Sequence, residues 1–278
     1  MTTASSPPQT SDPRAAAPVR GQGPGDAPVI ERVPWSELGP TFIETWGRPR
    51  GKNEPEHLQI LGPSGSGKGV FLRDILIERA RRRASRMVFI ATKPADKTTL
   101  SMGWPIVQDW RGVNQYEQVI YWPKTSKLGV ARKEYQRAKV MDLLNRLWHP
   151  DSNTVVIYDE LGRVEKLGPD VREVVEMYFT EGRALGITNV YGKQRTQGVT
   201  RDATANTDWK VTFQMADQAD AERTAELFGP KRVFTPIVQS LNRERFEFLI
   251  QHKLDMTTYI SWVDKPVKAP PKQTGYRK

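Results

Sequence analysis

Residues 57–69 decide the fold of this 278-residue chain, and they read His57-Leu-Gln-Ile-Leu61 followed by Gly62-Pro63-Ser64-Gly65-Ser66-Gly67-Lys68-Gly69. The apolar stretch predicts a short strand, the glycine-rich stretch a turn, and residues 68 to about 84 a helix. The turn fits the phosphate-binding pattern GxxxxGK in the strand–loop–helix setting that this pattern requires. Glycines let successive backbone N–H groups face the phosphates, and the helix N-terminus adds its positive end.

Two positions of this loop define what it can bind. Lys68 is expected to reach the β- and γ-phosphates of a nucleotide, and residues 62–69 together form the expected nucleotide site. Gly69 departs from the pattern, because it stands where a Ser or Thr normally ligates magnesium. The alternative is an ordinary glycine-rich turn before a helix.

Strand-like stretches recur along the chain, and helix-like stretches separate them. Further strands are expected at 86–91, 117–122, 154–159, 187–192 and 209–214, with helices at about 130–148, 169–185 and 219–228. Residues 245–252 alternate like a late antiparallel strand. Repeated strand–helix units predict an α/β fold with a mainly parallel sheet that helices cover on both faces.

A second element with chemical meaning is the apolar stretch 155–158, which ends in Asp159-Glu160. An aspartate at the carboxyl end of a core strand can hold magnesium through water. A glutamate directly after it can orient and deprotonate an attacking water. The pair therefore favours hydrolysis over transfer to a small acceptor. The alternative is an Asp-Glu helix cap after a strand.

A third element lies around the next expected strand. Glu181-Gly-Arg183-Ala-Leu-Gly precedes that strand, which leads into Gly192-Lys-Gln194-Arg-Thr. At the strand end, the Gln194 amide can sense the γ-phosphate or position water. Arg183 can project toward a neighbouring subunit, or it can be a cation that the dipole favours at a helix C-terminus.

Taken together, the three elements resemble the FtsK–HerA superfamily of DNA-pumping ATPases, which includes chromosome translocases, conjugative coupling proteins and genome-packaging ATPases of several viruses. The resemblance covers about residues 55–230, including 205–213 and 217–228, which are similar to the last core strand and helix of that family. It implies a RecA-like P-loop NTPase fold that binds ATP and Mg²⁺. The matching positions imply Walker roles for Lys68, Asp159 and Glu160, an arginine finger at Arg183, and a catalytic glutamine at Gln194.

The same resemblance implies a ring, expected to be a hexamer, that surrounds duplex DNA without sequence preference and hydrolyses ATP at subunit interfaces. The size of the chain resembles the packaging ATPases more than the chromosome translocases. We therefore expect a DNA translocase that acts in genome packaging or DNA transfer. The alternatives are an assembly or secretion ATPase that moves protein, and a nucleotide-binding scaffold that does not hydrolyse ATP, which only Gly69 suggests.

Composition supports a polyanionic partner and excludes several other classes. The chain has 42 Lys and Arg against 32 Asp and Glu, a formal net charge of +10. It has no cysteine, so disulfides and thiolate sites are excluded, and its three histidines have no metal-ligand spacing. The absence of a long apolar run or a signal core predicts no membrane insertion and a cytoplasmic protein, of a bacterial cell or a virus-infected host.

The ends of the chain differ from the middle in composition. Residues 1–30 are rich in Pro, Gly and Ser and are expected to be disordered, residues 31–263 to form the ATPase domain, and residues 264–278 to be a basic, Pro-rich tail.

Three basic segments are candidate DNA contacts. They are 93–97 continuing through Trp104 to Trp110-Arg111, the segment from Arg195 to Arg201, and the cluster Arg79, Arg81, Arg82, Arg83 and Arg86. For the arginine cluster, a solvated helix end is favoured. For Trp104 and Trp110, packing into the core is favoured over base stacking.

Overall fold

The computed structural model describes residues 30–46, 55–82, 86–194 and 201–263. Within these ranges, ten strands form one sheet in the order β1-β10-β9-β8-β2-β7-β6-β3-β5-β4. The strands are β1 (Glu31–Arg32), β2 (Leu58–Leu61), β3 (Arg86–Ile90), β4 (Ile106–Val107), β5 (Gln118–Tyr121), β6 (Thr154–Tyr158), β7 (Thr188–Lys193), β8 (Trp209–Phe213), β9 (Phe248–His252) and β10 (Thr258–Ser261).

The helices follow the strands along the chain. They are α1 (Trp35–Trp46), α2 (Lys68–Arg82), α3 (Lys97–Leu100), α4 (Trp110–Val113), α5 (Gly129–Leu147), α6 (Leu161–Glu165), α7 (Pro169–Thr180), the 3₁₀ helix η2 (Gly182–Leu185), α8 (Arg201–Ala205), α9 (Gln218–Ala225) and α10 (Lys231–Ser240). No helix among the described residues combines the length and the apolar character needed to cross a bilayer.

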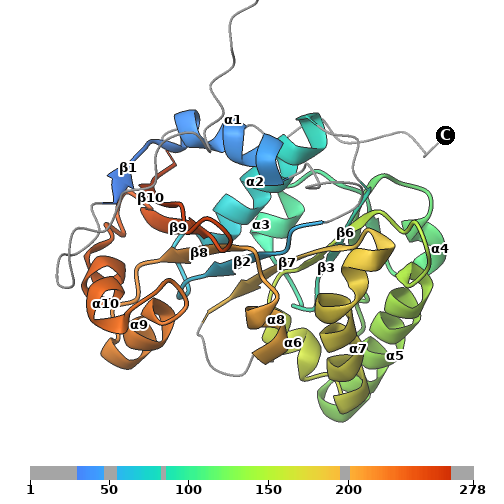
Figure 1. The fold of residues 1–278 in the computed structure, drawn as a ribbon. Coiled ribbons are helices and arrows are strands. Elements are labelled where there is room, and N and C mark those ends of the chain that lie inside the picture. The colour runs from blue at the N-terminus through green and yellow to red at the C-terminus, as the bar shows by residue number, and fades with distance from the viewer. Residues whose placement is uncertain (1–29, 47–54, 83–85, 195–200, 264–278) are drawn as a thin grey trace, which may run out of the picture.

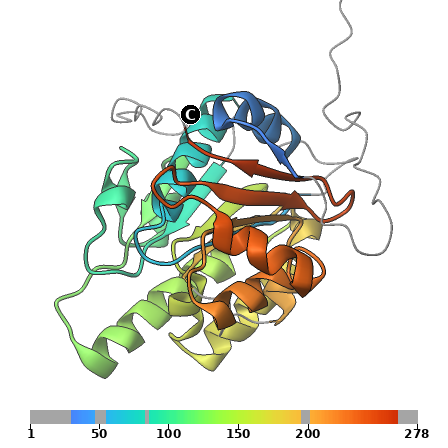
Figure 2. The ribbon, with the colours of Figure 1, turned by 90° about the vertical axis from the view of Figure 1, so that its left-hand side faces the viewer.

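The pairing of the central strands confirms a mainly parallel sheet. β8, β2, β7, β6, β3, β5 and β4 pair in parallel, whereas β9 is antiparallel to both β8 and β10. The antiparallel strand expected at 245–252 is thus confirmed as β9. Figure 2 shows β9 and β10 side by side between α1 and the pair α9–α10.

Helices cover both faces of the sheet, with α1 and α2 on one face and α5, α6, α7, α9 and α10 on the other (Figure 1). Side chains of β6 pack against helices on both faces of the sheet. Val155 and Ile157 pack into the cluster that includes Phe42 of α1 and Phe71 of α2. Val156 and Tyr158 pack with residues of α5 and α7. A strand buried on both faces reads as a continuous apolar run, which is why its position could be predicted.

One expected helix, residues 169–185, is wrong as a continuous element. α7 ends at Thr180, and η2 follows over Gly182–Leu185. Gly186 adopts a left-handed conformation with φ of 75°, and the Ile187 N–H donates to Gly182 O at 2.9 Å. This tight end turns the chain directly into β7 and separates Arg183 from the regular helix.

The expected tails, residues 1–30 and 264–278, fall almost wholly outside the described residues, since only residue 30 of them is described. The helix α1 near the start of the described domain was not predicted. Its Trp35, Phe42 and Trp46 are buried, and Pro40 lies inside it, so tertiary packing outweighs the low helix propensity of proline at this position.

Gly192 of β7 allows β7 to approach the chain where it leaves β6. A Cβ atom at residue 192 would lie 2.5 Å from the backbone oxygen of Asp159. We expect Gly192→Ala to lower the free energy of unfolding by about 1–3 kcal/mol, because the added methyl group must push two strand ends apart. Urea denaturation followed by circular dichroism measures this change.

Gly69→Ala is the matched control, because a Cβ at residue 69 would meet no atom closer than 3.6 Å. Its free energy of unfolding is expected to stay within about 0.5 kcal/mol of the wild-type value or to rise. Equal stabilities of the Gly192→Ala and wild-type proteins would contradict the close approach of β7 to Asp159.

Candidate active site

The loop between β2 and α2 follows a path that glycine makes possible. Gly65 and Gly67 have φ values of 76° and 93°, in the left-handed region that other residues rarely adopt. A Cβ at residue 67 would also lie 2.7 Å from the ring of Phe246. The Gly62 N–H donates to Lys193 O at 3.0 Å, which ties the start of the loop to the end of β7. The predicted strand–loop–helix unit is therefore present.

Lys68 begins α2 and lies in a pocket at the carboxyl edge of the parallel strands. Asp159, Lys93, Asp96 and Gln194 line the same pocket. Burial lowers the pKa of Lys68, and the negative charge of Asp159 partly opposes this shift. The structure thus brings together the Lys68 and Asp159 side chains that the sequence places far apart.

Glu160 and Gln194 are in contact at the same edge. Gln194 Nε2 donates to Glu160 Oε2 at 3.4 Å, and Ser64 Oγ donates to Gln194 Oε1 at 3.3 Å. Arg163 Nε also donates to Glu160 Oε2, at 2.9 Å. A chain of polar side chains therefore joins the phosphate loop to the carboxylate that is expected to act on water. Asp159 and Glu160 are positioned by the end of β6, as the sequence predicts.

Lys93 also lies in this pocket, although the sequence analysis predicted a DNA contact for it. Its Nζ lies 2.6 Å from Asp159 Oδ2 and 3.0 Å from Asp96 Oδ2. Lys93 therefore faces the phosphate pocket, although residues 93–97 were expected as a DNA contact. The signal that could have located it is topological: it follows β3, which pairs in parallel with β6, so both strands end at one edge.

The residues at the two positions of the implied magnesium site, Gly69 and Asp159, fit a magnesium ion poorly. Gly69 offers no hydroxyl, and Asp159 is already paired with the ammonium group of Lys93. Among the described residues, no group of three or more His, Asp or Glu side chains could hold a metal ion. Asp159 as a magnesium ligand stays a prediction that requires Lys93 to move.

Arg183 lies at the amino ends of the parallel strands, whereas the phosphate loop lies at their carboxyl ends. It precedes β7, and Leu61 of β2 pairs with Lys193 at the far end of β7. At about 3.3 Å per strand residue, the two edges are on the order of 15–20 Å apart. Arg183 is therefore not placed to reach the phosphate site of its own chain.

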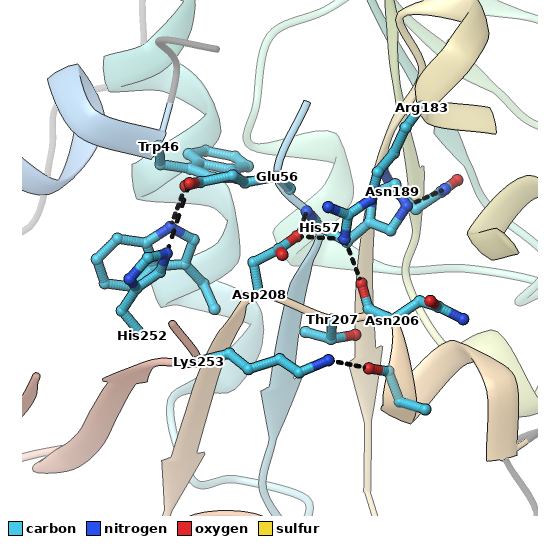
Figure 3. Close-up of polar contacts among 12 residues, drawn as sticks. Trp46, Glu56, His57, Arg183, Asn189, Asn206, Thr207, Asp208, His252 and Lys253 are labelled. Atoms are coloured by element: carbon cyan, nitrogen blue, oxygen red, sulfur yellow. Dashed lines mark hydrogen bonds and ion pairs between the residues drawn. The ribbon is translucent and has the colours of Figure 1, made fainter. Parts of the chain in front are cut away.

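At that edge Arg183 is held by contacts within the chain (Figure 3). Its Nη2 donates to Asp208 Oδ2 at 2.7 Å and to Asn206 O at 2.6 Å. The Asp208 carboxylate also accepts from the His57 N–H at 2.7 Å. The Arg183 side chain keeps 34 % of its surface exposed, so part of it remains accessible from outside.

The surroundings of Arg183 influence the protonation of two buried groups. Burial raises the pKa of Asp208, and Arg183 opposes this shift. Burial lowers the pKa of His57 to about 3, and the positive charge of Arg183 adds to the effect. His57 is therefore neutral at physiological pH, and its Nδ1 accepts from the Asn189 N–H at 3.1 Å.

The other candidates for DNA contacts differ in how far they are buried. Trp104 is buried at 4 % exposure, so its predicted packing into the core is confirmed. Trp110 is partly buried against the core, and the Arg146 guanidinium stacks 4.3 Å from its ring centroid. Residues 195–200, the Arg201 side chain and Arg83 lie outside what the structure describes.

The arginine cluster at the end of α2 divides into two environments. Arg79 is buried, and its guanidinium lies 4.2 Å from the Trp46 ring centroid, so a solvated position is wrong for this residue. Arg81 and Arg82 are exposed and pair with Glu78, as expected for a solvated helix end. Arg86 Nη2 donates to Asn114 Oδ1 at 2.7 Å.

Comparison with known proteins places this architecture among P-loop ATPases. No family model matches the sequence, and no curated protein matches it. The genome packaging NTPase B204 of Sulfolobus turreted icosahedral virus 2, in complex with sulfate, superposes with a TM-score of 0.57 at 14% identity. The match covers 77% of this chain and 98% of the B204 chain. This chain shares the fold of B204, an α/β fold of the RecA-like P-loop type.

Two further ATPases of known structure share this fold. The cytoplasmic domain of the type VII secretion ATPase EccC of Thermomonospora curvata gives a TM-score of 0.56 at 14% identity, over 81% of this chain and 28% of the EccC chain. EssC of Geobacillus thermodenitrificans gives 0.51 at 15% identity, over 78% and 40% of the two chains. The predicted α/β RecA-like fold is thus confirmed.

Proposed function

We propose that this protein is an ATP-hydrolysing motor that translocates duplex DNA without sequence preference, in genome packaging or DNA transfer. The observation that carries the proposal is that Lys68, Asp159 and Gln194 line one pocket beside the phosphate loop, where Gln194 also donates a hydrogen bond to Glu160. B204, the neighbour that matches over almost its full length, is described as a genome packaging NTPase and has been solved with AMPPCP and ATP-gammaS. We propose a location in the cytoplasm of a bacterial cell or a virus-infected host.

In the proposed reaction, the loop N–H groups and Lys68 bind the β- and γ-phosphates of ATP. Glu160 accepts a proton from a water molecule while the water oxygen forms a bond to the γ-phosphorus. The bond from that phosphorus to the bridging oxygen breaks, and ADP leaves. Gln194 contacts both Glu160 and Ser64, so it can orient the water relative to the phosphate.

The proposed assembly is a ring, with six subunits implied by the family resemblance. Its support is the position of Arg183, which lies at the edge opposite to its own phosphate loop and is partly exposed. In a ring, one subunit can present this edge to the carboxyl edge of its neighbour. Arg183 would then stabilise the charge on the γ-phosphate of the neighbour's ATP.

A second candidate function is an ATPase that moves protein, which the likeness to the type VII secretion ATPase EccC supports. The net charge of +10 favours DNA, because a polyanion is attracted to a basic protein. Stimulation of ATP turnover by duplex DNA separates the two functions.

Two substitutions test the hydrolytic site. Glu160→Gln is expected to bind ATP with unchanged affinity and to lose turnover by at least ~100-fold, because the water loses its base while the phosphate contacts remain. Lys68→Ala is expected to weaken ATP binding itself. Phosphate release and the fluorescence of a labelled ATP analogue measure the two effects. Equal turnover of Glu160→Gln and the wild type would reject Glu160 as the base.

Arg183→Ala tests the composite site. It is expected to bind ATP almost normally and to hydrolyse it ~10³-fold more slowly, because a transition-state contact is lost. Mixing it with Lys68→Ala subunits is expected to restore part of the turnover, since some interfaces then combine an intact loop with an intact arginine.

The controls for this experiment separate catalysis from folding. Arg172→Ala removes an exposed arginine of α7 that pairs with Glu176, and it is expected to keep full turnover. Arg183→Lys keeps a positive charge beside Asp208 and reports on folding. If size-exclusion chromatography shows that mixed rings form and these rings stay inactive, the role of Arg183 is only to pair with Asp208.

A further inference from the structure

The phosphate pocket differs from a usual magnesium–nucleotide site at two residues, Lys93 and Gly69. The Lys93 ammonium group contacts the carboxylates of Asp159 and Asp96, and Gly69 lacks the hydroxyl of a usual magnesium site. We propose that Lys93 is a second phosphate-binding lysine, which acts with Lys68 so that nucleotide binding depends little on magnesium. This inference rests on the proposed function, since it concerns the same nucleotide site.

The backbone of Lys93 is held in place by the core. Trp122, which is fully buried, donates from Nε1 to Lys93 O at 2.7 Å. Gln136 Nε2 and Arg132 Nη2 donate to the carbonyl oxygen of the preceding Thr92, at 3.1 and 3.0 Å. The backbone position of Lys93, in the segment that follows β3, is therefore set before any ligand binds.

The carboxylate partners of Lys93 are also fixed. Asp96 is the N-cap of α3, and its Oδ1 accepts from the Thr99 N–H at 3.0 Å. Asp159 follows directly on the buried end of β6. The Lys93 ammonium group thus lies between two carboxylates that come from neighbouring strand ends.

The charge of Lys93 is maintained although its side chain is only 25 % exposed. Burial opposes the charged form, but the attraction and hydrogen bonds of Asp159 and Asp96 outweigh it and raise the pKa of Lys93. An ammonium group has three N–H donors, and the two carboxylates accept two of them. Among the described residues no third acceptor is recorded for it, so one donor can serve a phosphate oxygen.

Lys93 lies close enough to the phosphate loop to share a pocket with it. Lys93 lines the same pocket as Ser64, Gly65 and Lys68 of the phosphate loop. A fixed ammonium group offsets negative phosphate charge in the way that a bound cation does. It also occupies Oδ2 of Asp159, one of the two carboxylate oxygens that could hold a metal-bound water.

The missing hydroxyl at residue 69 is not forced by packing. A Cβ at this position would lie 3.6 Å from Thr98 Cγ2, an ordinary contact, and its backbone is outside the left-handed region. A Ser therefore fits there. Gly69 lacks a metal ligand, which weakens magnesium binding, and the Lys93 ammonium group supplies a positive charge in the same pocket.

The test measures the affinity for a fluorescent, non-hydrolysable ATP analogue in excess magnesium and in excess EDTA. The wild type is expected to bind within ~3-fold under the two conditions. Lys93→Met is expected to bind at least ~10-fold more weakly in EDTA than the wild type, with a smaller loss in magnesium, because a charged phosphate contact is removed. Lys93→Arg is expected to retain binding in EDTA.

A control and a rescue accompany this measurement. Lys133→Met removes an exposed lysine of α5 and is expected to leave both affinities unchanged. Gly69→Ser combined with Lys93→Met restores a hydroxyl and frees Asp159, and it is expected to bind at least ~10-fold more tightly in magnesium than in EDTA. Thermal unfolding of each variant confirms that it is folded.

The outcomes distinguish this inference from the proposed function. If the wild type loses more than ~3-fold in EDTA, or if folded Lys93→Met shows the wild-type ratio of affinities, Lys93 does not replace magnesium. In that case a loss of binding in Lys68→Ala still supports the nucleotide site. If Lys68→Ala binds the analogue as the wild type does, the nucleotide site itself is wrong.

Discussion

The parallel pairing of β2, β7, β6 and β3 is the constraint on which the site depends. Parallel neighbours end at the same edge of a sheet, so the loop after β2, Gln194 after β7, Asp159 after β6 and Lys93 after β3 meet there. Binding in the crevice at the carboxyl ends of strands is a general property of open α/β sheets. Both faces of these strands are buried by helices, which fixes their register and with it the distances in the pocket.

The same constraint separates Arg183 from the phosphate loop. Residues that precede parallel strands gather at the other edge, where Arg183, Asp208 and His57 form a network of hydrogen bonds (Figure 3). In the proposed motor, the phosphate loop of one chain and Arg183 of another chain would complete one site. The proposed hydrolysis would therefore depend on assembly, whereas nucleotide binding would need one chain alone.

Sequence patterns predicted the parts of the site that lie within short stretches. The loop at 62–69 follows a local rule of glycine spacing, and Asp159-Glu160 follows an apolar run that only a buried strand explains. The role of Lys93 could not be predicted in this way, because it depends on which strands become neighbours. The break before η2 was missed because residues 169–185 keep a helix-like composition, and the turn at Gly186 is set by the entry into β7.

Two residues that contact the phosphate loop but lie far from it in the sequence could not be predicted either. Phe246 has a φ of 52° and packs against Gly67 from the segment before β9. The Arg243 side chain donates to Ser64 O at 3.4 Å from the same segment. Such contacts join parts of the chain separated by well over a hundred residues, and no local propensity encodes them.

The proposed motor requires ATP turnover that is coupled to DNA, and the steady-state ATPase rate as a function of duplex DNA concentration measures this coupling. We predict that duplexes of unrelated sequence raise the rate equally, and that the DNA affinity falls steeply as salt increases, because phosphate neutralisation releases counterions. A protein that hydrolyses ATP at the same rate with and without DNA, at every salt concentration, would contradict it.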